Sequence, residues 1–250
     1  MRRIFQLLAF VCCLVFSVYT FAQDTDLATI QVRSIGVAPY AFSNDSIDRG
    51  IYFEVANLLL KRLGYSHRNR VAPYARIIKE LQTGQTDLTI MFKYKELDDY
   101  VTFLAPIPAL KIVVLGLKGH GFKAINDLKG KRLAYLRGAK FNDEIDENSE
   151  IIRFDMINFE QGVQMLLLGR VDAIIGPLEP ILFASIQLTE KSDLFDAPLV
   201  VGERTPWLQV SNKSLKKLPI DKLEKEFRLI LDGGEFGKIR QKYVPSSYFE

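Results

Sequence analysis

The sequence predicts an α/β protein with two lobes joined by a hinge of two crossing strands. Strand-like and helix-like segments alternate along most of the chain. The pattern L-x-x-G-x-x-D, followed by apolar residues, occurs at Leu81–Asp87 and again at Leu166–Asp172. An extended stretch suited to a crossing, Pro106–Leu115, lies between the two copies. Two copies, each preceded by the same order of elements, favour two units of related topology over a coincidence of helix-to-strand joints.

Residues 1–22 have the features of an export signal. A short basic start is followed by an apolar run and then by the small residue Ala22, which is the order of an exported leader. The alternative is a retained membrane anchor, because the run approaches the length that spans a bilayer. Gln6 and Ser17 interrupt the run, so we expect cleavage near Ala22 and a periplasmic mature protein.

Composition narrows the class of protein further. Both cysteines, Cys12 and Cys13, lie in the export signal, so the mature chain must rely on a buried core rather than on disulfides. The formal net charge is only +3 and the cations are scattered, which predicts no nucleic-acid partner. We expect a monomer, and the chain is long enough for one large domain or two small lobes.

In the first lobe, two segments have the spacing of amphipathic helices. Tyr52–Leu63 is followed by Gly64, and Tyr74–Thr83 is followed by Gly84; glycine suits a helix end because it tolerates the left-handed conformation. The other expected elements are the strand Ile30–Ile35, the loop Gly36–Phe42, the strand His67–Val71 and the strand Asp87–Met91.

The second half repeats this order. Its expected elements are the strand Arg132–Leu136, a helix start at Phe141–Glu147, the strand Ile151–Phe154, the helix Glu160–Leu168 and the strand Asp172–Ile175. Each copy of L-x-x-G-x-x-D is then a helix that exits into a parallel strand. In this interpretation the leucine packs on the sheet, the glycine permits the turn, and the aspartate sits at the edge.

The chain is expected to return to the first lobe near its end. Leu199–Arg204 is a second extended stretch, and the helices Leu215–Leu231 and Phe236–Tyr243 follow it, separated by a glycine pair. We expect both helices to pack on the first lobe. This assigns residues 23–107 and 203–250 to the first lobe and residues 108–202 to the second.

Six blocks of sequence, in order, resemble a known family. They are GVAPYAFSND, GIYFEVANLLLKRLG, VAPYARIIKELQTGQTDLTI, INDLKGKRLAYLRGAKF, GVQMLLLGRVDAII and GGEFGKIRQKYVPSSYF. Together they resemble family 3 of the extracytoplasmic solute-binding proteins, the amino-acid-binding type of periplasmic receptor. The resemblance implies a type II periplasmic-binding-protein-like fold that closes around a small solute. It also implies a partner in the inner membrane, either an ABC transporter or, as the alternative, a signalling receptor.

The same resemblance implies aromatic walls for the cleft. Tyr74 holds the place of the ring that stacks on the ligand, and Tyr40 is the candidate in the loop after the first strand. Phe92, Tyr94 and Trp207 are candidates for further aromatic surface. The competing interpretation is that the tyrosines are half-buried core residues and that Trp207 packs under the hinge.

Two departures from the family pattern concern the ligand. FKYKELDDYVTF lacks the arginine that holds an α-carboxylate in amino-acid binders, and neither Lys93 nor Lys95 has the planar fork for that contact. The second-lobe strand runs into Gly176-Pro177-Leu178, so that Glu179 is shifted from the place of the acidic residue that pairs with an α-ammonium. An α-amino acid is therefore not the predicted ligand.

Other arginines are candidates for binding a carboxylate. Arg76 lies just beyond Tyr74, and Arg137 with Gly138 follows a strand at an expected helix N-terminus, where free N–H groups suit an anion. The competing interpretation is an exposed helix arginine and a surface loop. We predict a small polar solute, with a carboxylate as its candidate charged group.

The sequence predicts a binding protein rather than an enzyme. His67 and His120 are its only histidines, and neither belongs to a metal or nucleophile motif. We therefore expect no metal and no cofactor. The alternative is a cleft enzyme, such as a dehydratase, that uses one carboxylate as a general acid.

Overall fold

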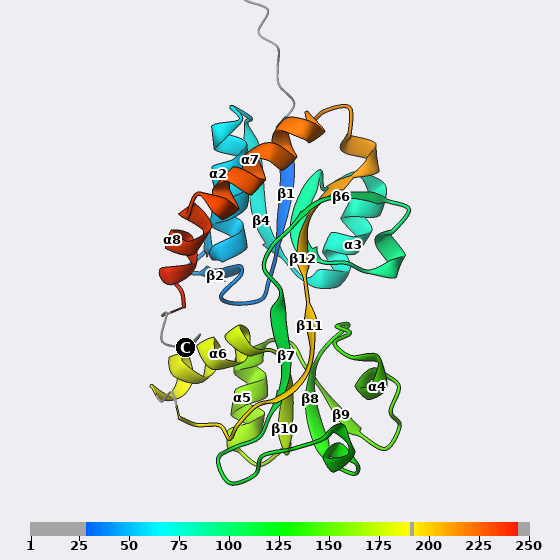
Figure 1. Cartoon of the computed structure of the whole chain (residues 1–250), viewed down its shortest axis with the longest axis vertical. Coiled ribbons are helices and arrows are strands. Elements are labelled where there is room, and N and C mark those ends of the chain that lie inside the picture. Colours follow the sequence, from blue (N-terminus) through cyan, green and yellow to red (C-terminus); the bar gives the residue numbers. More distant parts are fainter. Residues whose placement is uncertain (1–28, 191–192, 245–250) are drawn as a thin grey trace, which may run out of the picture.

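Two five-stranded sheets form the upper and lower lobes of the molecule (Figure 1). The computed structural model describes residues 29–190 and 193–244, so the export signal expected at residues 1–22 lies outside the described residues. Within those two described ranges, no helix is both long enough and apolar enough to cross a bilayer.

The first lobe has the strand order β4-β1-β5-β12-β6. β1 pairs in parallel with β4 and β5, whereas β12 is antiparallel to β5 and β6. Helices α2, α7 and α8 contact one another on one face, and α3 packs on the other face with its own buried cluster. The strands are β1 (Ile30–Ile35), β4 (His67–Ala72), β5 (Leu88–Phe92), β6 (Val101–Pro106) and β12 (Pro206–Ser211), beside the hairpin of β2 (Phe42–Asn44) and β3 (Ile47–Arg49). The helices are α2 (Ile51–Arg62), α3 (Tyr74–Thr83), α7 (Ile220–Asp232), α8 (Glu235–Gln241), η1 (Lys95–Leu97) and η3 (Asn212–Ser214).

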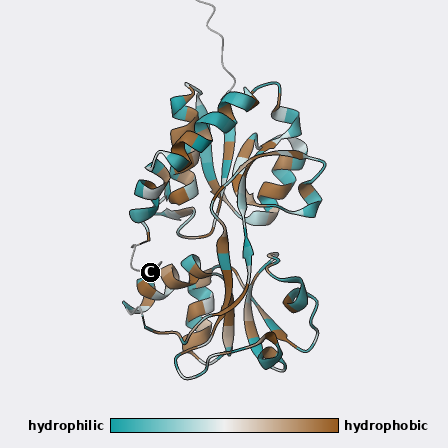
Figure 2. Cartoon of the chain, viewed as in Figure 1, coloured by the Kyte–Doolittle hydropathy of each residue, from teal (hydrophilic) through white to brown (hydrophobic). Residues whose placement is uncertain are grey.

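The second lobe has the strand order β11-β7-β10-β8-β9. β8 is parallel to β9 and β10, and β7 is antiparallel to β10 and β11. Its strands are β7 (Leu110–Leu115), β8 (Arg132–Leu136), β9 (Ile152–Met156), β10 (Ala173–Pro177) and β11 (Leu199–Arg204). Its helices are η2 (Ile125–Leu128), α4 (Asp143–Asp146), α5 (Phe159–Leu167) and α6 (Leu178–Thr189). Figure 2 shows mostly hydrophobic residues along β7 in the lower lobe and a mixture of hydrophobic and hydrophilic residues along the helices.

The hinge is a ribbon of two antiparallel crossings. One crossing joins β6 to β7 and the other joins β11 to β12, and the Ile107 N–H donates to the Pro206 carbonyl between them at 2.8 Å. The prediction of two crossing strands is confirmed. Arg204 still pairs with Leu110 in the second sheet, so the return crossing falls at Thr205.

The repeated motif makes the same contacts in both lobes. The Asp87 N–H donates to the Gln31 carbonyl at 2.7 Å, and the Asp87 carboxylate accepts the Gln31 N–H at 2.7 Å. Asp172 makes the same pair of bonds with Arg132, at 2.7 and 2.8 Å. Each aspartate therefore fixes the start of its strand against the neighbouring parallel strand, after a glycine with a left-handed backbone at 84 and at 169.

Two expectations about helices need correction. The helix expected at Leu215–Leu231 begins only at Ile220. Pro219 disfavours helical backbone angles at the residue before it, so the helix starts after this proline. Helix α6 was not predicted, and it follows directly after Pro177. Pro180 lies in the first turn of α6, where the N–H that proline lacks would have no partner within the helix.

Asp87 and Asp172 provide a matched test of this joint. Asp87 is 1% exposed and also contacts Ser214 and Lys217, whereas the side chains of Asp172 and Arg132 are 33% and 39% exposed. We expect Asp87→Asn to lower the free energy of unfolding by about 3 kcal/mol, because it leaves buried donors poorly paired. The same change at Asp172 should cost only about 1 kcal/mol. Urea denaturation at pH 7 measures both, and equal losses would contradict the dependence on burial.

The contribution of Asp172 should depend on pH. The hydrogen bonds and charge of Arg132 hold the pKa of Asp172 below its usual value. A depressed folded-state pKa stabilises the protein above the unfolded pKa, which is about 4, and that stabilisation is lost as pH falls through the folded pKa. The stability difference between the wild type and Asp172→Asn should therefore shrink between pH 5 and about pH 3. A difference that stays constant over this range would contradict the role of the ionised carboxylate.

Candidate functional site

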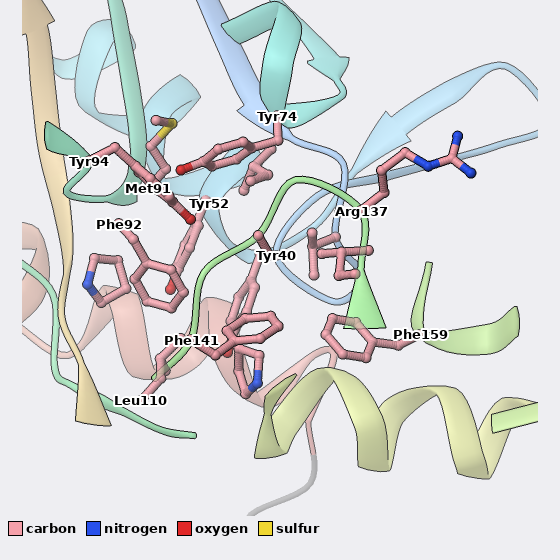
Figure 3. Close-up of a pocket in the computed structure, with 16 residues that line it drawn as sticks. Tyr40, Tyr52, Tyr74, Met91, Phe92, Tyr94, Leu110, Arg137, Phe141 and Phe159 are labelled. Carbon is pink, nitrogen blue, oxygen red and sulfur yellow. The ribbon is translucent and has the colours of Figure 1, made fainter. Parts of the chain in front are cut away.

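A pocket lies between the two lobes (Figure 3). Sixteen residues line the pocket, which holds a cavity of about 50 Å³ and opens to solvent, and seven of them are aromatic. The aromatic residues are Tyr40, Tyr52, Tyr74, Phe92 and Tyr94 from the first lobe and Phe141 and Phe159 from the second. Neither lobe therefore forms the pocket alone.

The pocket forms where the carboxyl ends of the parallel strands face it. β1 ends at Ile35, β5 at Phe92 and β10 at Pro177, and all three residues line the pocket. Loops and helix starts follow these strand ends, and α/β sheets place their ligand sites there. Tyr74 is the first residue of α3 and Phe159 is the first residue of α5, so helix starts supply rings from opposite lobes.

The rings of the first lobe pack on one another. The centroids of Tyr74 and Tyr94 are 4.3 Å apart in an edge-on arrangement, and those of Tyr40 and Tyr52 are 4.5 Å apart in a stacked one. Such pairs stabilise each other beyond the area that they bury. They present a rigid aromatic wall to the second lobe.

Glu179 joins the lobes at one side of the pocket. This residue lies in the first turn of α6 and is 7% exposed. Its carboxylate accepts a hydrogen bond from the Tyr40 hydroxyl at 3.2 Å and forms an ion pair with Arg240 of α8. Burial and the charge of Glu179 raise the pKa of Tyr40 well above its usual value, so the phenol keeps its proton. Phe42 and Phe183 continue the contact between the lobes, with centroids 5.9 Å apart.

Arg204 joins the lobes beside the hinge. Its guanidinium donates to the Lys93 carbonyl of the first lobe at 2.9 Å and to the Lys140 carbonyl of the second. It also lies over the rings of Phe92 and Tyr94, at 4.9 and 5.2 Å from their centroids. Sequence reasoning treated this residue only as the end of a strand, because nothing local marks a side chain that bridges lobes.

Five of the eight residues predicted from the sequence line the pocket: Tyr40, Tyr74, Phe92, Tyr94 and Arg137. The guanidinium of Arg137, however, points away from the pocket in Figure 3. It pairs with Asp155 on the neighbouring strand at 3.3 Å, and its side chain is 69% exposed. The structure thus places the ring candidates at the pocket but directs the charge of Arg137 outward.

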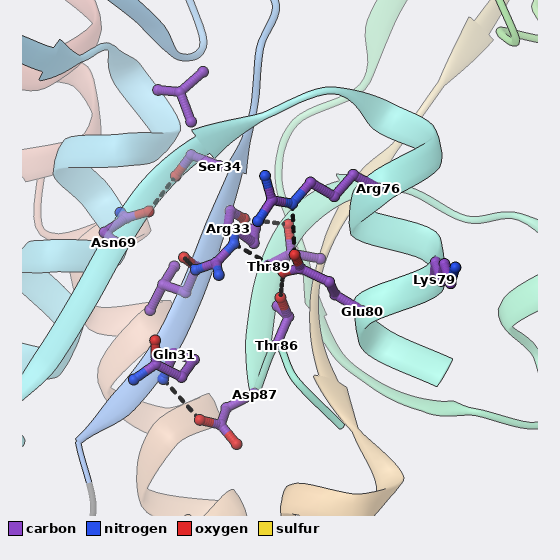
Figure 4. Close-up of polar contacts among 12 residues, drawn as sticks. Gln31, Arg33, Ser34, Asn69, Arg76, Lys79, Glu80, Thr86, Asp87 and Thr89 are labelled. Atoms are coloured by element: carbon purple, nitrogen blue, oxygen red, sulfur yellow. Dashed lines mark hydrogen bonds and ion pairs between the residues drawn. The ribbon is translucent and has the colours of Figure 1, made fainter. Parts of the chain in front are cut away.

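Arg76, Gly138 and Trp207 do not line the pocket. Arg76 pairs with Glu80 at 2.6 Å, and Glu80 also binds Arg33 (Figure 4). Gly138 is in a left-handed turn and not at a helix start, because α4 begins only at 143 and its first turn is capped by the preceding asparagine. Trp207 lies in β12 at the hinge, where Lys93 Nζ is 3.7 Å from its ring centroid.

Three aromatic residues of the pocket were missed: Tyr52, Phe141 and Phe159. Two of them share a signal with Tyr74. Tyr52 and Phe159 lie in the first turns of α2 and α5, and these are helices that follow the loops at the pocket. An aromatic residue in the first turn of such a helix is therefore the sequence feature that would have found them.

Comparison with known proteins agrees with this architecture. The family model for bacterial extracellular solute-binding proteins, family 3, matches residues 32–246. The chain belongs to this family. The resemblance inferred from the sequence and the predicted two-lobed fold are both confirmed. None of the curated proteins compared with the chain matches it.

Solved structures of binding proteins share the fold of this family member. A mutant of ArgBP from T. maritima aligns with a TM-score of 0.73 at 19% identity, over 86% of this chain and 94% of that one. The GluR0 ligand-binding core with L-glutamate gives 0.74 at 15% identity, over 86% and 98%. A histidine kinase sensor domain similar to periplasmic binding proteins gives 0.74 at 15%, over 87% and 96%. At these identities the likeness shows the fold alone.

The Glu179 contact should bias the two lobes toward each other. We expect Glu179→Gln to lower the ratio of closed to open molecules about tenfold or more, because a charge-assisted contact between the lobes is lost. Small-angle X-ray scattering of the ligand-free protein measures this as a larger radius of gyration. Glu144→Gln, at an exposed position of the same lobe, is the control and should leave the radius unchanged. Equal radii for the wild type and Glu179→Gln would contradict a role in closure.

Proposed function

We propose that this family member is an exported receptor that captures a small solute between its lobes and delivers it to an inner-membrane transporter. The observation that carries the proposal is that both lobes supply walls of one aromatic pocket, while two crossings join them within the described residues. A solute that contacts both lobes binds the closed form best. Its binding therefore shifts the population toward closure.

Closure gives the receptor a form that a partner can recognise. The surfaces of the two lobes change their relative position when the hinge closes, so a membrane protein that contacts both lobes distinguishes the loaded from the empty state. The contacts of Glu179 and of Arg204 each join the two lobes. In this proposal the partner detects the bound solute through the shape of the closed receptor, and the solute itself is not chemically changed.

Export to the periplasm is part of this proposal. The basic, apolar and small-residue order of residues 1–22 supports it. The description of the family as extracellular supports it as well. A mature protein that begins just after Ala22, as measured by N-terminal sequencing of the secreted form, would establish the cleavage site.

Sensing is the second candidate function. It is favoured by the structural likeness to a histidine kinase sensor domain, although at 15% identity that likeness extends only to the fold. In this case the closed form engages a signalling receptor rather than a transporter. Genes for transporter subunits next to this one would favour delivery, and a gene for a kinase would favour sensing.

We infer that the site binds without catalysis. The family consists of solute-binding proteins. Across residues 29–190 and 193–244, no group of three or more His, Cys, Asp or Glu side chains could hold a metal ion. His67 contacts the Tyr65 carbonyl through Nδ1, outside the pocket. Turnover of a bound solute would overturn this inference.

Tyr74 is the residue to change in a test of the receptor function. A thermal-shift screen of small solutes identifies those that raise the melting temperature by binding the folded state. For a solute found in this way, Tyr74→Ala should weaken binding about tenfold or more, equal to about 1.4 kcal/mol, because one wall is lost. Tyr100→Ala, at a tyrosine that is 45% exposed, should bind normally. Unchanged affinity in Tyr74→Ala would place the solute elsewhere.

A further inference from the structure

Among the residues that the structure describes, the lining of the interlobe pocket offers almost no charge to a solute. Of the sixteen residues that line it, fifteen carry no charge, and the exception is Arg137. The Arg137 guanidinium points outward and pairs with Asp155. An ionised carboxylate or ammonium buried here without a partner costs far more free energy than an uncharged polar group.

Two charged side chains that contact residues of the pocket are already engaged. The Glu179 carboxylate binds the Tyr40 hydroxyl and Arg240. The Arg204 guanidinium donates to two backbone carbonyls and covers two rings of the pocket. A zwitterionic amino acid would have to break these contacts before its own charges were paired.

Two buried hydroxyl groups in the pocket lack a hydrogen-bond partner. They belong to Tyr52 and Tyr74, and neither oxygen has a partner in the part of the chain that the structure describes. Burial raises the pKa of Tyr52, so this phenol stays protonated and can donate. A buried hydroxyl without a partner is costly. A polar atom of a bound solute would satisfy each one.

Resting on the receptor function proposed above, we infer that the pocket takes a flat, uncharged ring compound that accepts hydrogen bonds from Tyr52 and Tyr74. Aromatic amides and ketones belong to this class. Rings from both lobes, such as Phe92 and Phe159, line the pocket and offer apolar surface to a flat compound (Figure 3). This ligand class replaces the carboxylate expected from Arg76 and Arg137, whose guanidinium groups are paired outside the pocket.

Three probes with the same benzene ring separate the ligand classes. Benzamide is uncharged, benzoate carries one negative charge, and L-phenylalanine is a zwitterion. Titration of the mature protein, followed by calorimetry and by amide chemical shifts, should show benzamide binding at least about tenfold more tightly than the other two. Tighter binding of benzoate or L-phenylalanine would overturn the inferred class.

The two hydroxyl groups are tested by Tyr52→Phe and Tyr74→Phe. Each change removes an oxygen without a partner, so the melting temperature of the ligand-free protein should rise by about 2–4 °C while benzamide binds about tenfold more weakly. Tyr135→Phe is the stability control. The Tyr135 hydroxyl contacts Asp146 and accepts the Phe141 N–H at 3.2 Å, so this variant should melt at a lower temperature.

The possible outcomes distinguish this inference from the receptor function. Melting temperatures of Tyr52→Phe and Tyr74→Phe that fall as in Tyr135→Phe would overturn the role of the two hydroxyls. If a charged solute binds more tightly than benzamide and Tyr74→Ala weakens it, the ligand class is wrong and the receptor function stands. If no solute of the screen, charged or uncharged, compacts the protein in scattering experiments, both are wrong.

Discussion

The antiparallel pairing of the two crossing strands is the constraint on which the other features depend. β6 and β12 are paired in the first sheet, β7 and β11 are paired in the second, and Ile107 bonds to Pro206 between them. Because both strands enter a sheet at each end, the lobes cannot slide past one another, but the short joint lets them rotate. The carboxyl ends of the parallel strands in both lobes therefore face one shared space. The pocket and the contacts of Glu179 and Arg204 are possible only because this ribbon keeps the two halves in register.

Much of the fold could be predicted because its signals are local. The bounds of α3 and β11 agree with those expected, since amphipathic spacing and an αL glycine define the helix and an extended apolar stretch defines the strand. The repeat of L-x-x-G-x-x-D correctly indicated two related lobes. Asp87 in the first lobe and Asp172 in the second make equivalent hydrogen bonds. Helix α6 could not be found in this way. Proline is tolerated at a helix start but is also common in loops, so Pro177 and Pro180 do not distinguish the two.

The site was less predictable, because it depends on how two distant segments face each other. The resemblance located Tyr40 and Tyr74, but Tyr52 and Phe159 were missed, since the direction of a ring follows from the placement of its helix. Charge was harder still. Arg137 was expected to bind an anion, but Asp155 on the adjacent strand draws its guanidinium outward. Register between strands decides such a contact, and no pattern within a single segment contains that information. The outcome is a pocket of rings and hydroxyl groups.

The buried contact of Glu179 has a consequence for the empty protein. Because Tyr40 and Arg240 of the first lobe complete the environment of a second-lobe carboxylate, part of the drive to shut comes from the polypeptide itself. Closure then requires less binding free energy from the solute. This suits a weakly polar solute in a pocket whose described lining residues offer almost no charge. For the receptor function proposed above, the same self-attraction implies background activity, because a fraction of empty molecules would present the closed shape. A membrane partner that reads shape alone would respond to this fraction, so its baseline would scale with the amount of receptor.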